Sequence, residues 1–218
     1  MCHLGHPVAM TKRLPKPALL LAALLAGLSY WAASHVLPTG AVLAAWKGTC
    51  VGLLALWALM SAPTTAGRWI ALVLAFGALG DVLLETSGLT VGAVAFLIGH
   101  LLATALYWSR RRTGRDGTTP AILLMLGVPL SAYALSGSPG VLLYGLALGA
   151  MAATAWISRF PRGLVGAGAV LFAVSDLLIF ARMGPLAGSI VPDLLVWPLY
   201  LAGQAMIAVG VVTSERAR

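Results

Sequence analysis

Charged residues are scarce in this sequence. Asp, Glu, Lys and Arg make up only 9% of its 218 residues, whereas 60% are hydrophobic. Soluble domains carry roughly a quarter of their residues as charged side chains. The composition therefore excludes an ordinary soluble globule, and the apolar excess is expected to face lipid.

Other patterns are missing as well. Cys2 and Cys50 are the only cysteines, and two distant cysteines exclude a disulfide-rich scaffold. Polar and apolar residues do not alternate along the apolar segments, since 19–28, for example, is continuously apolar or small. This excludes a transmembrane β-barrel. Helices are the remaining structure that can span a bilayer.

Apolar runs of about 17–25 residues predict eight transmembrane helices. The expected spans are 17–36, 41–60, 69–86, 90–108, 120–136, 140–158, 163–181 and 192–212. The fold class is therefore expected to be all-α, a polytopic membrane protein. One transmembrane domain at 17–212 is expected between tails at 1–16 and 213–218.

Basic residues support this count, because they fall on alternate sides of the eight spans. Of the 14 Lys and Arg residues, all but Lys47 and Arg182 lie in the two tails and in the second, fourth and sixth loops. The positive-inside rule then predicts cytoplasmic termini in a multipass protein of the cell membrane. The net charge of +8 is explained by loops that face anionic lipid head groups. It does not indicate nucleic-acid binding, because no aromatic residues are interleaved with the cations.

A few ionisable residues fall inside the apolar spans, where a charge costs about 2.5–3.5 kcal/mol on insertion scales. They are Lys47, Asp81, His100 and Asp176, with Glu85 and Asp193 at span edges and Tyr200 and Gln204 as polar neighbours. The alternating direction of the helices converts sequence position into depth. It places the charged members in the outer half of the bundle, with His100 and Gln204 nearer mid-depth. We expect them to line a cavity suited to an amphiphile with a polar head and an apolar tail.

Several of these residues also have an ordinary structural interpretation. Lys47 is expected either to neutralise a buried aspartate or to bind substrate. Glu85 fits an interface residue at a helix end. Asp193 fits a helix N-cap, and His100 fits a hydrogen-bonded core histidine.

Asp81 and Asp176 are harder to explain structurally. Two buried acids with one lysine leave an unbalanced charge, so one of them is expected to hold a proton. They also stand in similar segments, Gly80–Leu84 and Ser175–Ile179, each with a small residue, an Asp and aliphatic residues. Four helices separate the copies, so the pattern is compatible with a parallel 4+4 repeat that places both aspartates at one site.

These segments resemble those of the YhhN family of multipass membrane proteins, which includes the lysoplasmalogenases. The resemblance covers nearly the whole chain, and Lys47 matches the family's intramembrane lysine. Its most specific parts are Gly80-Asp81 with the following aliphatic residues, His100, Ser175-Asp176-Leu177-Leu178, and Pro198, Tyr200 and Gln204. Three residues depart from the family pattern. Gly48 stands where proline is common in the family, and Ala103 and Leu201 stand where tyrosine is common.

The resemblance implies hydrolysis of the vinyl-ether bond of a lysoplasmalogen, which releases a fatty aldehyde and glycerophospho-ethanolamine or glycerophosphocholine. This reaction needs a carboxylic acid that protonates the alkene carbon and a second carboxylate that stabilises the resulting cation or activates water. Asp81 and Asp176 are the expected catalytic pair. The residues expected to bind the lysophospholipid substrate are Lys47, His100, Asp193, Tyr200 and Gln204. No cofactor or metal is expected, because Cys2, His3 and His6 fall short of a ligand cluster.

Two other classes of function remain open at this point. A transporter would also bury Asp, Lys and His residues, but its charges would lie near the midplane so that both sides can reach them. A non-catalytic lipid-binding protein would keep its function after loss of either aspartate. The lipid bilayer is a partner in every case, and the sequence does not determine the oligomeric state.

Overall fold

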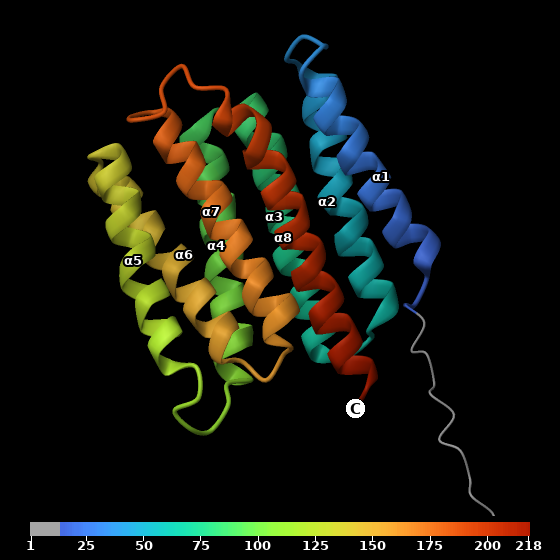
Figure 1. Ribbon diagram of the computed structural model, residues 1–218. Helices are drawn as coiled ribbons and strands as arrows, with labels where there is room; N and C mark the ends of the chain where they lie inside the picture. Colours follow the sequence, from blue (N-terminus) through green and yellow to red (C-terminus); the bar gives the residue numbers. More distant parts are fainter. Residues whose placement is uncertain (1–13) are drawn as a thin grey trace, which may run out of the picture.

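Eight helices long and apolar enough to cross a membrane make up the computed structural model, which describes residues 14–218 (Figure 1). Their bounds are α1 Pro17–Ser34, α2 Ala41–Ser61, α3 Thr65–Thr86, α4 Leu89–Ser109, α5 Thr118–Ser136, α6 Pro139–Ile157, α7 Ala167–Arg182 and α8 Val191–Arg216. A short π-helical turn, η1 (Arg162–Gly166), leads into α7. The prediction of an all-α membrane protein with eight spans is confirmed. Cys2, His3 and His6 lie outside the described residues.

Two helix ends extend four residues beyond the spans expected from hydropathy. α3 begins at residue 65 rather than 69, because the Thr64 side chain accepts a hydrogen bond from the backbone N–H of Gly67 and caps the helix. α8 continues to residue 216 rather than ending at 212. Its last turn is held by Glu215, which is buried and lies 3.0 Å from Arg110. Both ends are fixed by polar contacts, which a hydropathy pattern does not register.

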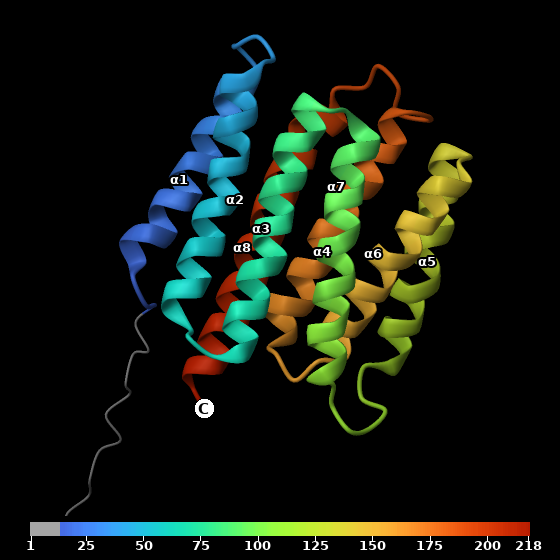
Figure 2. The ribbon, with the colours of Figure 1, turned by 180° about the vertical axis from the view of Figure 1, so that it is seen from behind.

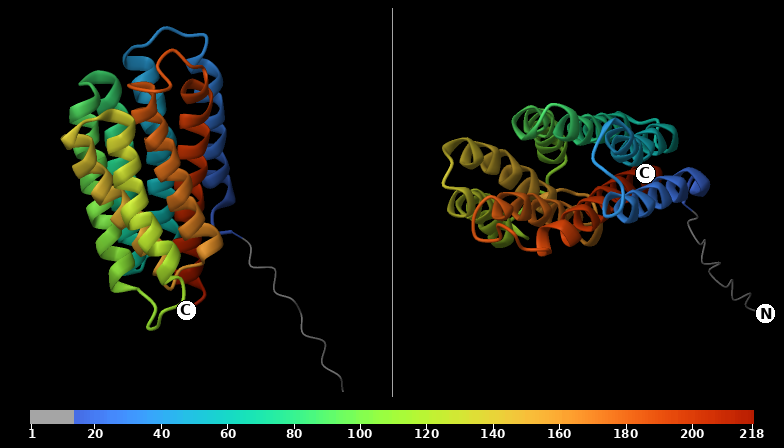
Figure 3. Two further views of the ribbon diagram at one scale, coloured as in Figure 1. Left: turned by 60° about the vertical axis from the view of Figure 1, so that its left-hand side comes forward. Right: turned by 90° about the horizontal axis from the view of Figure 1, so that it is seen from above.

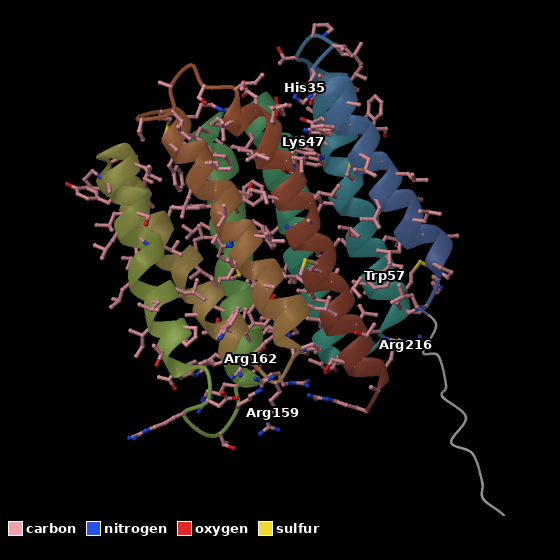
Figure 4. All side chains as sticks on the ribbon, in the orientation of Figure 1. His35, Lys47, Trp57, Arg159, Arg162 and Arg216 are labelled. Carbon is pink, nitrogen blue, oxygen red and sulfur yellow. The ribbon has the colours of Figure 1, made fainter. Side chains whose placement is uncertain are left out.

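Successive helices run in opposite directions. The start of α1 and the C-terminus therefore lie at the same end of the bundle, which we call the lower end as drawn in Figure 1. Every described Lys and Arg except Lys47 and Arg182 belongs to this lower end. Figure 4 shows Arg159 and Arg216 there, and Lys47 with His35 at the upper end. The positive-inside rule predicts that the lower end faces the cytoplasm.

The helices form two layers, which are visible from above (Figure 3). One layer consists of α2, α3 and α4, the other of α1, α8 and α7, and α5 and α6 close one side. α8 packs against α2 and α3 across the layers. Within the described chain, the backbone of α7 does not approach that of α3 or α4. The candidate site lies in this part of the bundle.

Close contacts hold neighbouring helices together. A Cβ on Gly168 of α7 would lie 2.8 Å from the carbonyl oxygen of Gly203 of α8, and a Cβ on Gly203 would lie 2.7 Å from the carbonyl oxygen of Gly168. Only glycine at both positions allows the two backbones to approach so closely, as is common between membrane helices.

The peripheral helix α1 is fastened by tryptophan side chains. Trp197 Nε1 of α8 donates to the Gly27 carbonyl at 2.8 Å, and Trp46 Nε1 of α2 donates to the Ala26 carbonyl at 3.2 Å. Tyr30 of α1 packs edge-on against Trp197, with 4.5 Å between ring centroids. These contacts fix α1 as a wall of the candidate site.

Candidate active site

A cavity of about 840 Å³ lies in the upper half of the bundle. Every helix except α5 contributes to its walls. Of the residues predicted to form the site, this cavity is lined by Lys47, Asp81, Asp176, Asp193 and Tyr200. Small-molecule sites usually have volumes of about 300–1,000 Å³. The cavity is therefore large enough for an organic substrate.

Asp81 of α3 is held by two residues of α8. The Tyr200 hydroxyl donates a hydrogen bond to Asp81 Oδ2 at 2.8 Å, and Gln204 Nε2 donates to the Tyr200 hydroxyl at 3.3 Å. Tyr200 and Gln204 are four residues apart, so they share one face of α8. The result is a hydrogen-bonded chain from an amide through a phenol to a carboxyl that is only 2% exposed.

Asp176 of α7 is held in the same manner by residues of α6 and α4. The Tyr144 hydroxyl donates to Asp176 Oδ2 at 2.6 Å. His100 Nε2 lies 2.9 Å from the Tyr144 hydroxyl and 3.8 Å from Asp176 Oδ2. Because the Tyr144 proton is directed to the carboxyl, the phenol oxygen is left to accept, and this assigns a proton to Nε2 of His100.

The two hydrogen-bonded chains are joined by an aromatic cluster. The Phe172 ring lies edge-on to His100, with 5.1 Å between centroids, and edge-on to Tyr200 at 5.2 Å. Phe96 packs edge-on against Tyr200 at 5.9 Å. These rings fix the orientation of the side chains that hold both aspartates.

The two carboxyls are bound in the same way. In each case a tyrosine binds Oδ2, and Oδ1 makes no hydrogen bond to any residue of the described chain. Neither carboxyl forms an ion pair with a Lys or Arg among residues 14–218. Two buried carboxyls that each keep one oxygen for a ligand are suited to acid–base chemistry.

Lys47 forms its ion pair with Glu85 and is not in direct ion-pair contact with a buried aspartate of the described chain. Its Nζ lies 2.9 Å from Glu85 Oε1. Glu85 follows Asp81 by four residues on α3, one helical turn nearer the upper end, and the Lys47 side chain reaches this outer carboxylate. Glu85 is therefore more than an interface residue, because it shares the cavity wall with Lys47. The Lys47 ammonium also lies 5.9 Å from the Trp197 ring centroid, within the range of a cation–π interaction.

A second ion pair lines the cavity nearer its mouth. Arg182 Nη2 lies 2.8 Å from Asp193 Oδ1, and the two side chains are 48% and 58% exposed. The N-cap of α8 is Ile190, and Asp193 lies in the first turn of the helix. The N-cap interpretation of Asp193 is therefore wrong. In the first turn its carboxylate still lies near the positive end of the helix dipole.

A smaller pocket of about 20 Å³ lies beneath the cavity. His100 and Gln204, the predicted site residues that do not line the larger cavity, line this pocket, and Phe96 lines both spaces. The buried Tyr107 hydroxyl, also in the lining, has no hydrogen-bond partner in the described chain. His100 and Gln204 thus support the two tyrosines from below, where the pocket has room for about one water molecule.

Sequence reasoning missed Tyr144. This residue stands in an apolar stretch of α6 without a charged neighbour. A search for ionisable groups at membrane depth passes over it, because a phenol is neutral. The usable signal is the need for a hydrogen-bond donor beside each buried carboxyl, which would direct attention to the hydroxyl groups of neighbouring spans.

The fold and the site define the class of protein. It is a polytopic α-helical membrane protein with a polar internal site toward one end of its bundle. Among residues 14–218, no group of three or more His, Cys, Asp or Glu side chains is placed to hold a metal ion.

The family model of the YhhN family matches residues 42–211, which is most of the chain, and the chain belongs to this family. The match begins in the first turn of α2, so α1 lies outside it although Tyr30 lines the cavity. No curated protein and no solved structure matches the chain.

Proposed function

We propose that the protein is a lysoplasmalogenase-like hydrolase, which cleaves the vinyl-ether bond of a single-chain ether phospholipid. The observation that carries this proposal is the pair of buried carboxyls, Asp81 and Asp176, on the wall of one cavity. Each is held through Oδ2 by a tyrosine, and each keeps Oδ1 for a ligand. Membership of the YhhN family supports a hydrolase in general terms.

The cavity has a charged side and an apolar side. Two cation–carboxylate pairs, Lys47–Glu85 and Arg182–Asp193, line the charged side. They suit a zwitterionic head group, since the cations can bind a phosphate and the carboxylates an ammonium group. The cavity wall from α4 and α6 contains no charged residue. Asp81 lies one helical turn deeper than Glu85 on α3, and Asp176 lies more than one turn deeper than Arg182 on α7. At this depth the head group of a bound lipid would join its hydrocarbon chain.

The reaction begins with proton transfer to carbon. A carboxylic acid donates its proton to the outer alkene carbon, and the C=C–O group becomes an oxocarbenium ion. Water attacks the cationic carbon while the second carboxylate accepts a proton from the water, and a hemiacetal forms. Both carboxyl groups line the cavity, and the ionised one can stabilise the developing positive charge electrostatically.

Collapse of the hemiacetal completes the cycle. Its hydroxyl proton returns to the first carboxylate, and the second carboxyl gives its proton to the glycerol oxygen as the C–O bond breaks. A fatty aldehyde and a glycerophospho-base with a free hydroxyl are released. Both carboxyls regain their starting protonation states, so the reaction consumes one water and no cofactor.

We assign the acid role to Asp81 and the base role to Asp176. The acid must hold a proton before substrate reacts, and Asp81 has no positively charged partner within ion-pair distance in the described chain. The base must accept a proton from water, and His100 Nε2 lies 3.8 Å from Asp176 Oδ2. A histidine at that distance can support the ionised carboxylate.

Transport is the competing function. A carrier would expose its polar groups to both ends of the bundle. Here the charged residues that line the internal cavity lie in the upper half, and below the small pocket the helices are packed with buried apolar side chains such as Trp57, Ile70 and Val211. Further down in the described chain the buried charged residue is Glu215, which pairs with Arg110 in the last turn of α8. This one-sided arrangement favours an enzyme.

The test uses purified protein in detergent with two lipids that differ only in their chain linkage. One is an alkenyl lysophospholipid and the other is the acyl lysophospholipid with the same head group. We expect fatty aldehyde from the first, measured by mass spectrometry, and no fatty acid from the second. The proposal is overturned if no vinyl-ether lipid yields aldehyde while proteoliposomes accumulate a solute.

A further inference from the structure

Helices α4 and α6 lie together in the lower half of the bundle and separate in the upper half (Figure 2). In the lower half, Leu106 of α4 and Leu148 and Met151 of α6 are buried. In the upper half, Val94 of α4 is 52% exposed and Leu143 of α6 is 67% exposed. The two helices both begin at the upper end, so the separation is widest near their first turns.

The side chains on both edges of this separation also line the cavity. Apart from Thr90, Phe96 and Tyr144, they are Leu89, Ala93, Val94 and Leu97 of α4 and Val141 and Leu143 of α6. All are apolar, and all belong to segments that cross the membrane. The apolar side of the cavity therefore continues outward between two helices into the region where the surrounding medium is lipid hydrocarbon.

We propose that the separation between the upper halves of α4 and α6 is a lateral opening to the bilayer, occupied by the hydrocarbon chain of one single-chain lipid. The head group of this lipid lies at the charged side of the same cavity, beside Lys47 and Glu85. The inference rests on the proposed function for the bond that is cleaved, but lipid binding in the opening can be tested without turnover.

Two observations determine the occupant. The charged side of the cavity requires a partner with charged groups, because ion pairs at membrane depth are stabilised by further polar contacts. The side between α4 and α6 is apolar, and Val94 and Leu143 both line the cavity and face outward, so this side suits a hydrocarbon chain that continues from the cavity into the bilayer. A water-soluble ligand meets the first requirement but has no chain to place along this apolar side. A lipid with one chain meets both.

A lateral opening has a consequence for chain length. The chain leaves the cavity between the helices and extends into the bilayer, so the cavity volume does not set an upper limit on its length. Substrate also enters from the membrane with its head group moving sideways, and does not first have to leave the bilayer.

The first experiment maps lipid contact with a photoreactive amino acid, p-benzoylphenylalanine, in place of Val94 or Leu143. The probe is an alkenyl lysophospholipid with an alkyne at the end of its chain. Matched control positions are Leu123 of α5, which is 67% exposed, and Leu25 of α1, which is 55% exposed. We expect labelling at 94 and 143 to saturate and to be displaced by excess unlabelled lysophospholipid. Labelling at the control positions should neither saturate nor be displaced. Equal labelling at all four positions, or cross-linked protein dimers at 94 and 143, overturns the inference.

The second experiment fills the opening with Leu143→Trp and uses Leu123→Trp as its control. We expect kcat/KM for a long-chain vinyl-ether lysolipid to fall by about tenfold or more in Leu143→Trp, the size of a steric change in an apolar site. For a short-chain, water-soluble vinyl ether, we expect the loss of kcat/KM in Leu143→Trp to be several-fold smaller than the loss for the long-chain lysolipid, and Leu123→Trp to match the wild type with both substrates. An equal loss for both substrates contradicts a role in chain access.

The outcomes separate the two proposals. If the wild-type protein shows no turnover but the variants with p-benzoylphenylalanine at 94 or 143 are labelled saturably, the proposed hydrolase is overturned and the lipid-binding opening is retained. Turnover without saturable labelling overturns the lateral opening and retains the hydrolase.

Discussion

The two tyrosines hold the buried aspartates without a formal charge. A Lys or Arg beside either carboxyl would keep it ionised, whereas a phenol fixes Oδ2 and allows either protonation state. Tyr144 and Tyr200 each also accept a hydrogen bond from a deeper side chain, His100 or Gln204. The hydrogen-bonded chains therefore orient the carboxyls, and Oδ1 of each is left for the substrate.

Replacement of these tyrosines tests their positioning role. We expect Tyr144→Phe and Tyr200→Phe to lower kcat for vinyl-ether hydrolysis about 10- to 100-fold, because each removes one hydrogen bond to a carboxyl, worth about 1.5–3 kcal/mol when charged. Tyr133→Phe on α5, where the side chain is exposed, serves as the control and should keep wild-type kcat. Unchanged kcat in both active-site variants would show that the phenols do not orient the carboxyls.

For single residues, the sequence predicts which side chains lie in the candidate site, but not which of them form ion pairs or hydrogen bonds with each other. The cost of polar groups in lipid is enough to find Asp81 and Asp176. It does not identify the partner of Lys47, because Asp81 and Glu85 are only one turn, about 5.4 Å, apart along α3. That interval is within the error of a span boundary. Tyr144 carries no charge and gives no such signal.

The helices themselves follow from continuous apolar runs, since a bilayer requires every spanning backbone to satisfy its own hydrogen bonds. Their ends depend on single contacts such as the Thr64 cap of α3. The separation of α4 and α6 is not visible in the sequence, because both spans are apolar in the upper half as well as in the lower half. Likewise, the chain has 25 glycines, and composition alone does not show which of them lie at helix contacts.

The contact between α7 and α8 gives a prediction about stability. We expect Gly168→Ala and Gly203→Ala to destabilise the protein by about 1–3 kcal/mol, the usual cost of overpacking, because the added methyl group meets a backbone oxygen. Gly52→Ala and Gly127→Ala have open space around the added methyl group. They should leave the melting temperature in detergent unchanged or slightly raised, since alanine favours a helix. If all four variants melt alike, the close approach of α7 and α8 is not what stabilises this contact.

The charged residues of the whole molecule are distributed differently at its two ends. The arginine-rich loops lie at the lower end, while the cavity and its ion pairs lie in the upper half. The eight spans and the alternation of basic loops are predictable, because insertion depends on local hydropathy and charge. The two-layer arrangement is not, because helix association in lipid depends on detailed side-chain packing rather than on a hydrophobic pattern.

Cysteine labelling tests the orientation. In a background with Cys2→Ser and Cys50→Ser, we expect Val36→Cys in an upper loop to react with a membrane-impermeant maleimide in intact cells. Gly114→Cys in a lower loop should react only after permeabilisation, because the positive-inside rule places that loop in the cytoplasm. The reverse pattern would place the mouth of the cavity on the cytoplasmic side.

The proposed reaction depends most on Asp81 and Asp176, which exchange protons with the substrate and water. The most direct measurement is the rate of aldehyde release from an alkenyl lysophospholipid by Asp81→Asn and Asp176→Asn, each a neutral substitution of similar shape. The control is Asp116→Asn, whose exposed side chain pairs with Arg162 in a lower loop. We predict a decrease in kcat of about 100-fold or more for each active-site variant, the contribution expected of a general acid or base, with wild-type kcat in the control. Wild-type kcat in either Asp81→Asn or Asp176→Asn would contradict the paired mechanism.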